Sequence, residues 1–95
     1  MKKKTGSGFS KTPVSCMQEP VLRQLVRIAG LQEMTIWRSR KQDWHLSVTV
    51  TQRSQVVYLS TRRAPRLPRA FKRFDAALAA GQRVCATRQV TLVLL

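Results

Sequence analysis

The sequence has 95 residues, 43% of them hydrophobic, and 18 lysines and arginines stand against four acidic residues, for a formal net charge of +14. A chain of this length has room for one modest core and no second domain, and its hydrophobic content argues against global disorder. Self-repulsion among so many cations costs stability unless an anionic partner offsets it. The candidates are nucleic acid, an anionic membrane surface or an acidic protein, and the predominance of arginine favours nucleic acid, because its planar fork suits phosphates and guanine edges.

Residues 1–14 predict a flexible basic arm, because Lys2, Lys3 and Lys4 are followed by Gly and Ser residues. No apolar run follows the lysines, so a signal peptide is not expected. The arm is open to two interpretations: it lies along phosphates or in a groove, or it is a solubilising tail.

Residues 15–95 predict a single α+β domain that begins with a helix over residues 15–30. From Leu22 onward, apolar residues recur at the i, i+3, i+4 and i+7 spacing of one helical face. Pro20 suits a first helical turn, and Gly30 suits the C-terminal stop.

Three strands are predicted at residues 34–40, 44–51 and 55–61, because apolar and polar residues alternate with a period of two. Short polar loops separate them, so they form an antiparallel meander with one face toward the core. The residues expected on the opposite, outer face include Trp37, His45, Ser47, Thr49 and Tyr58.

An outward Trp37 requires an explanation, since large apolar groups on a wet sheet face are uncommon. Either it forms a stacking or wedge surface for nucleic acid, or a helix or the last strand covers it. His45 is interpreted as a surface residue rather than a metal ligand or a catalytic base.

Residues 62–73 contain six basic residues, and Pro65 and Pro68 preclude a continuous helix or a central strand there. We predict an extended segment that splays its arginines outward, either as a solvated charge run or as a phosphate-binding surface. A second helix follows over residues 71–80, ended by Gly81.

A final strand or apolar tail is predicted over residues 88–95, which gives the order α-β-β-β-α-β. An uncovered strand edge from Val90 to Leu95 would be a candidate homodimer contact.

No motif of a P-loop, a dinucleotide site, a zinc protease or a paired-carboxylate enzyme occurs, so we expect no enzyme and no cofactor. Cys16 and Cys85 lie far apart in sequence without a Cys/His cluster, so we expect no metal site and a reduced pair. No apolar run is long enough for a transmembrane helix, and a cytoplasmic location without membrane association is expected.

Four short motifs, WR, WHLSV, YLSTRR and PRAFKRFDAAL, lie at residues 37–38, 44–48, 58–63 and 68–78. With them, this part of the chain resembles a family of small partition-associated (ParC-like) proteins of conjugative plasmids and integrative elements. The resemblance implies a bacterial, cytoplasmic protein that takes part in maintenance or transfer of mobile DNA, with partition or relaxosome proteins as partners and no catalytic residues. The predicted element order also resembles the arm-type DNA-binding domains of integrases and the double-stranded RNA-binding domains.

The sequence therefore predicts a nucleic-acid-binding accessory protein, with DNA preferred, that acts in partition, transfer or regulation of a plasmid or mobile element. Two alternatives stay open: an RNA- or single-strand-binding protein, and an adaptor for an acidic protein partner. The predicted phosphate contacts are Arg38, Arg40, Arg53, Arg62, Arg63, Arg66, Arg69, Lys72 and Arg73. The predicted groove contacts are Trp37, His45, Thr49 and Tyr58.

Overall fold

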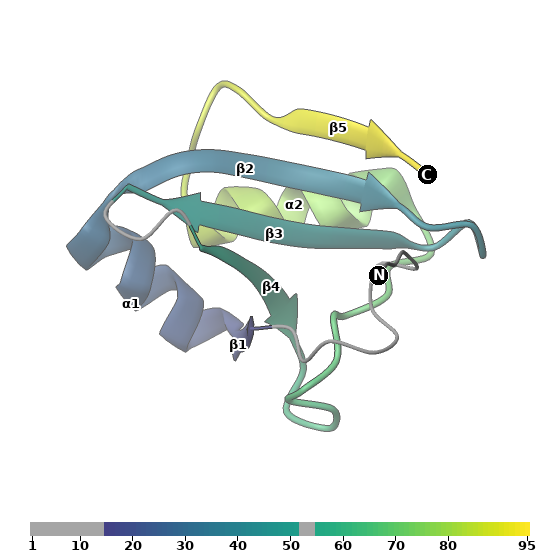
Figure 1. Ribbon diagram of the computed structural model, residues 1–95, viewed down its shortest axis with the longest axis horizontal. Helices are drawn as coiled ribbons and strands as arrows, with labels where there is room; N and C mark the ends of the chain where they lie inside the picture. Colours follow the sequence, from purple (N-terminus) through teal and green to yellow (C-terminus); the bar gives the residue numbers. More distant parts are fainter. Residues whose placement is uncertain (1–14, 52–54) are drawn as a thin grey trace, which may run out of the picture.

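The computed structural model describes residues 15–51 and 55–95, so the predicted basic arm and Arg53 lie outside the described residues. Two helices and five strands form one small α+β domain, which confirms the predicted fold class (Figure 1). The elements are β1 (Ser15–Gln18), α1 (Glu19–Ala29), β2 (Leu31–Arg38), β3 (Trp44–Val50), β4 (Val56–Ser60), α2 (Phe74–Val84) and β5 (Thr91–Leu94).

The strands form a single mixed sheet in the order β1-β4-β3-β2-β5. β2, β3 and β4 are the predicted antiparallel meander, and β1 and β5 each add a parallel strand at one edge. The chain reaches β5 through α2, a crossover of the kind that a parallel pairing requires. The sheet therefore has five strands, whereas the sequence predicted three and a possible fourth.

The first helix begins at Glu19, so the predicted start at residue 15 is wrong. A helix from residue 15 would place Pro20 beyond the first turn, where its missing N–H breaks the hydrogen-bond ladder. Residues 15–18 instead pair with β4 as β1. The predicted stop is confirmed: Gly30 has a φ of 85° and donates its N–H to Val26 O at 2.8 Å.

The second helix begins at Phe74 and ends at Val84, so Gly81 lies inside it and does not end it. A Cβ atom on Gly81 would lie 2.7 Å from Met34 Sδ and 3.3 Å from Leu46 Cδ1. The glycine therefore permits close packing of α2 on the sheet. Phe71, predicted as the first residue of this helix, instead pairs with Trp44 in an antiparallel bridge.

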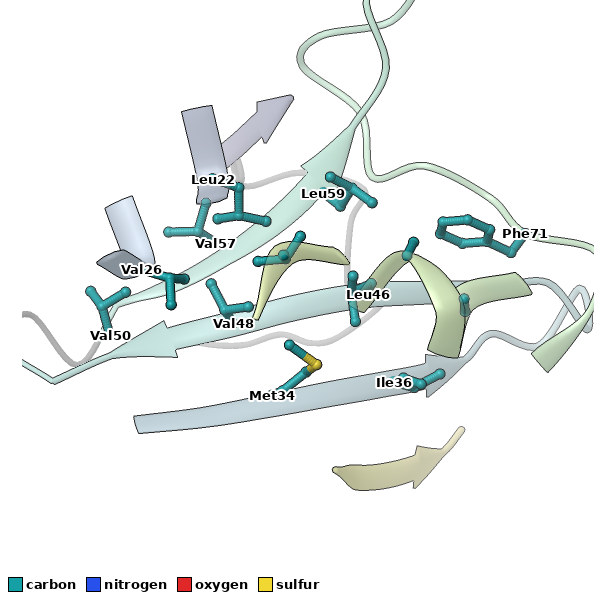
Figure 2. Close-up of a cluster of buried hydrophobic side chains, with 13 residues drawn as sticks. Leu22, Val26, Met34, Ile36, Leu46, Val48, Val50, Val57, Leu59 and Phe71 are labelled. Carbon is teal, nitrogen blue, oxygen red and sulfur yellow. The ribbon is translucent and has the colours of Figure 1, made fainter. Parts of the chain in front are cut away.

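The core lies between one face of the sheet and the two helices, which both pack on that face (Figure 1). Figure 2 shows Leu22 and Val26 of α1 beside Val57 of β4, with Met34 and Ile36 on β2. The inward positions predicted by alternation are confirmed, since the core side chains of β2, β3 and β4 are at most 2% exposed. Those side chains are Met34, Ile36, Leu46, Val48, Val50, Val57 and Leu59.

Within residues 15–51 and 55–95, neither helix combines the length and the apolar character that crossing a bilayer demands.

Candidate nucleic-acid interface

One end of the sheet gathers most of the described positive charge, and Trp44 lies at its centre. Trp44 is the Cα partner of Arg38 across the β2–β3 pair. It also exchanges backbone hydrogen bonds of 2.9 and 2.8 Å with Phe71, and its ring meets the Phe74 ring edge-on at a centroid distance of 5.2 Å. The end of β2, the 39–43 turn, the segment after β4 and the start of α2 therefore meet around one side chain.

We call this region the basic end: residues 38–44 and 61–75. It carries nine lysines and arginines against two carboxylates, Asp43 and Asp75. The nine cations are Arg38, Arg40, Lys41, Arg62, Arg63, Arg66, Arg69, Lys72 and Arg73. Eight of these were predicted phosphate contacts. Lys41 was missed, although its place in the predicted hairpin loop beside Arg40 could have indicated it.

Two of the nine cations face a carboxylate. Lys72 Nζ lies 3.7 Å from Asp43 Oδ1, and Arg73 Nε lies 3.0 Å from Asp75 Oδ1. The hydrogen bond from Arg73, with its charge, lowers the pKa of Asp75. Among the described residues, the other seven cations of the basic end have no carboxylate partner.

Two of these seven cations, both arginines, are held against aromatic rings. The guanidinium carbon of Arg38 lies 5.3 Å from the centroid of the Trp44 ring, and that of Arg69 lies 4.5 Å from the Phe71 ring. A stacked guanidinium keeps its N–H donors at the edge of its plane, where they remain available to an oxygen acceptor. The two arginines are thus oriented by the Trp44–Phe71 bridge.

The segment after β4 is anchored at its base. Arg69 N donates to Leu59 O at 2.7 Å, and His45 donates through Nδ1 to Arg69 O at 2.9 Å. His45 points to the outer face, as predicted, but it is 7% exposed, so its interpretation as a surface residue is wrong. The alternation along a strand predicts the face on which a side chain lies, but it does not predict whether another segment of the chain covers that side chain.

The outer sheet face carries the other predicted contacts. Trp37 donates through Nε1 to Ser47 Oγ at 2.7 Å, and its ring lies 6.2 Å from that of Tyr58 at 41°. Burial raises the pKa of Tyr58, and its neighbour Cys16 on β1 adds to the shift. Trp37 is half-buried, and its indole N–H is already engaged.

The predicted phosphate contacts and the predicted groove contacts lie in different parts of the structure. Thr49 pairs with Glu33 on β2 and with Val56 on β4, toward the far end of β3 from Trp44. In β1 to β5, the residues that face outward include Glu33 but no lysine or arginine. Most of the described positive charge therefore lies at the end of the sheet and not on its outer face, and the predicted groove contacts stay a prediction.

Four described cations lie away from the basic end, on α1, on α2 and in the connection to β5. They are Arg23, Arg27, Arg83 and Arg88.

No family model, curated protein or solved structure matches this chain. Function is therefore inferred from the residues and their geometry.

Proposed function

We propose that this protein binds nucleic acid through the basic end, with duplex DNA as the preferred partner. Its role would be that of an accessory protein in partition, transfer or regulation of a plasmid or other mobile element. The observation that carries the proposal is that nine cations, against two carboxylates, lie in the two segments joined by the Trp44–Phe71 bridge. The mobile-element context is supported by the resemblance of residues 37–78 to partition-associated proteins.

The mechanism is neutralisation of phosphates. Each lysine or arginine that contacts a phosphate releases condensed counterions, so affinity falls steeply as salt rises. Arg38 and Arg69 start from stacked positions, and less side-chain entropy is lost when they bind an oxygen. The exposed arginines of residues 62–66 and the cations of the 39–43 turn extend the contact to neighbouring phosphates.

The placement of the aromatic rings favours a duplex over a single strand. Single-strand binding uses exposed rings on which successive bases stack. Here Trp37 packs against Tyr58, and Trp44 packs against Phe74 and carries Arg38 on its ring. Their faces are already engaged by protein groups, which leaves the phosphates as the main contact.

A salt titration tests the proposal. Binding of labelled duplex DNA, single-stranded DNA and structured RNA is measured by fluorescence anisotropy at several salt concentrations. With about six phosphate contacts, the slope of log affinity against log salt for the duplex should be near −5. We expect the duplex to bind most tightly.

A slope near zero would contradict phosphate neutralisation. Stronger binding of single strands or RNA would support the RNA-binding alternative. The adaptor alternative predicts that a protein partner stays bound to the chain after nuclease treatment, while the duplex binds weakly.

We also propose that β5 pairs two copies of the chain. β5 is bonded to β2 along one edge only, and on the described residues no strand pairs with its other edge. Leu92 and Leu94 are more than half exposed. An apolar, uncovered edge strand is a template for pairing with another chain.

Leu94→Lys places a charge on that edge, so it should shift the sedimentation coefficient from a dimer toward a monomer at micromolar concentration. A wild-type chain that sediments as a monomer at all concentrations would overturn the dimer and leave DNA binding untouched.

A further inference from the structure

The segment of residues 61–68, which we call the arginine loop, presents an apolar side chain among cations. Leu67 is 63% exposed, and the loop also carries Arg62, Arg63 and Arg66, all exposed. In Figure 1 the loop extends beyond the end of β4, away from the sheet. A single exposed leucine is common on a protein surface, so what distinguishes Leu67 is its place among three exposed arginines.

The arginine loop is braced by its own hydrogen bonds. Ala64 N donates to Thr61 Oγ1 at 3.1 Å, and Leu67 N donates to Ala64 O at 3.2 Å. The second bond closes a β-turn with Pro65 in its second position, which the fixed φ of proline favours. The prediction of a fully extended segment is therefore wrong at this turn.

The backbone at Leu67 is restricted. The residue before a proline is restricted to extended backbone conformations, and Pro68 follows Leu67 directly. One residue further on, Arg69 N is bonded to Leu59 O, which fixes the base of the loop to β4. A loop whose backbone is restricted in this way loses little backbone freedom on binding.

We propose that the arginine loop enters the minor groove of duplex DNA and that Leu67 wedges between two base pairs and bends the duplex. This inference rests on the proposed function and specifies its binding mode. Proteins that bend DNA from the minor groove combine arginines with an inserted apolar side chain, often leucine or proline. The arginine loop has arginines and an exposed leucine within six residues, on a turn that is held by hydrogen bonds.

The charges of the loop fit the same arrangement. The narrow minor groove of A·T-rich DNA has an enhanced negative potential that attracts arginine. Arg63 precedes the turn and Arg66 is its third residue, and both would contact the groove and its phosphates, while Leu67 partly unstacks one base step. The bend then brings the flanking phosphates toward Arg38, Arg40 and Lys41 of the basic end.

A bending measurement tests the wedge. A duplex of about 30 base pairs with a donor and an acceptor dye at its ends reports bending as increased energy transfer. Leu67→Ala is compared with Ile28→Ala, which removes an apolar side chain that is 73% exposed on α1. Wild type and Ile28→Ala should bend the duplex equally.

Leu67→Ala should lose most of the bend and bind about tenfold more weakly, because the contacts that the bend permits are lost with it. Its thermal midpoint should match that of wild type, since an exposed side chain contributes little to folding. A polyamide that occupies the A·T minor groove should displace wild type from the duplex.

Three outcomes overturn the inference. If wild type binds without bending, or if Leu67→Ala bends as well as Ile28→Ala, the wedge is wrong while the proposed function stands. If wild type does not bind duplex DNA at all, the proposed function itself fails.

A further outcome concerns a membrane. If Leu67→Ala abolishes flotation with phosphatidylserine-containing vesicles but leaves DNA bending intact, the loop inserts into anionic lipid and not into a groove.

Discussion

The basic end and the junction of α1 with α2 use arginine in opposite ways. At the junction, Glu19 takes two partners: Arg23 Nη2 lies 2.9 Å from one carboxylate oxygen, and Arg83 Nη2 lies 3.2 Å from the other. Arg23 also donates through Nε to the backbone oxygen of Arg83 at 3.1 Å, near the end of α2. One carboxylate and two arginines thereby join the start of one helix to the end of the other.

The cations of the basic end are not neutralised by carboxylates to the same extent. Seven of its nine cations lack a described carboxylate partner, and the two that have one, Lys72 and Arg73, are themselves largely exposed. Like charges held together lower the stability of the folded chain. The comparison indicates that the arginines of the junction serve the fold, whereas those of the basic end are retained for an external anion.

The largest expected effect comes from removing two cations of the basic end, compared with removing two cations that lie away from it. Arg63→Ala with Arg66→Ala should weaken duplex binding about 100-fold at roughly 0.1 M salt, and the salt slope should become shallower by about 2. Arg27→Ala with Arg88→Ala removes the same charge away from the basic end. Anisotropy titrations at several salt concentrations measure both.

The control pair should bind within a few-fold of wild type, with an unchanged slope. If the two pairs lose affinity equally, net charge alone governs binding and the basic end is not an interface. If the Arg63 and Arg66 pair affects one DNA sequence only, those side chains read bases rather than phosphates.

A substitution in the core should lower the stability of the fold and leave DNA binding unchanged. Gly81→Val places carbon atoms where Met34 Sδ and Leu46 Cδ1 already lie, so overpacking should lower the free energy of unfolding by about 1–3 kcal/mol. Urea unfolding at neutral pH measures it. Folded Gly81→Val should keep the wild-type salt slope, because no cation of the basic end has moved.

Ala79→Val is the control, since Ala79 is exposed on the same helix. It should cost only the difference in helix propensity, roughly 0.6 kcal/mol. Equal losses for the two variants would mean that α2 is less closely packed on Met34 than the distances indicate.

The sequence predicted the antiparallel meander because that pairing is local and each strand alternates. It could not predict β1, since residues 15–18 show no alternation and pair with a strand about forty residues away. Gly81 was misinterpreted for a related reason. A glycine at a helix end and a glycine at a close helix–sheet contact look alike until the opposing residue, here Met34, is known.

The candidate site was predicted in part. The composition of residues 62–73 identified its arginines, but alternation predicted contacts on the outer face, where none of the described strand residues is a lysine or an arginine. The convergence depends on the backbone pairing of Trp44 with Phe71, residues of two segments with no shared pattern. No signal within either segment specifies that pairing.

The smallest expected effects give the sharpest comparison of the junction with the basic end. Neutralising either Glu19 or Asp75 changes the net charge of the chain by the same single unit. The hydrogen bond from Arg83 and the charges of Arg83 and Arg23 lower the pKa of Glu19. A lowered folded pKa means that Glu19 stabilises the fold above its ordinary pKa and loses this contribution as pH falls through the folded value. Glu19→Gln should therefore unfold about 0.5–1 kcal/mol more easily than wild type at neutral pH. That difference should disappear in acid.

Asp75→Asn should show the complementary behaviour. Asp75 is exposed, and its ion pair among the described residues is with Arg73, so its neutralisation should leave urea unfolding nearly unchanged. It removes one of two carboxylates from the basic end, and duplex binding at low salt should tighten by roughly twofold. Glu19→Gln adds the same unit of positive charge at the junction and should not tighten binding. If the two variants changed the affinity for the duplex equally, binding would depend on the overall charge of the chain. The distinction between paired and unpaired arginines would then have no role in binding.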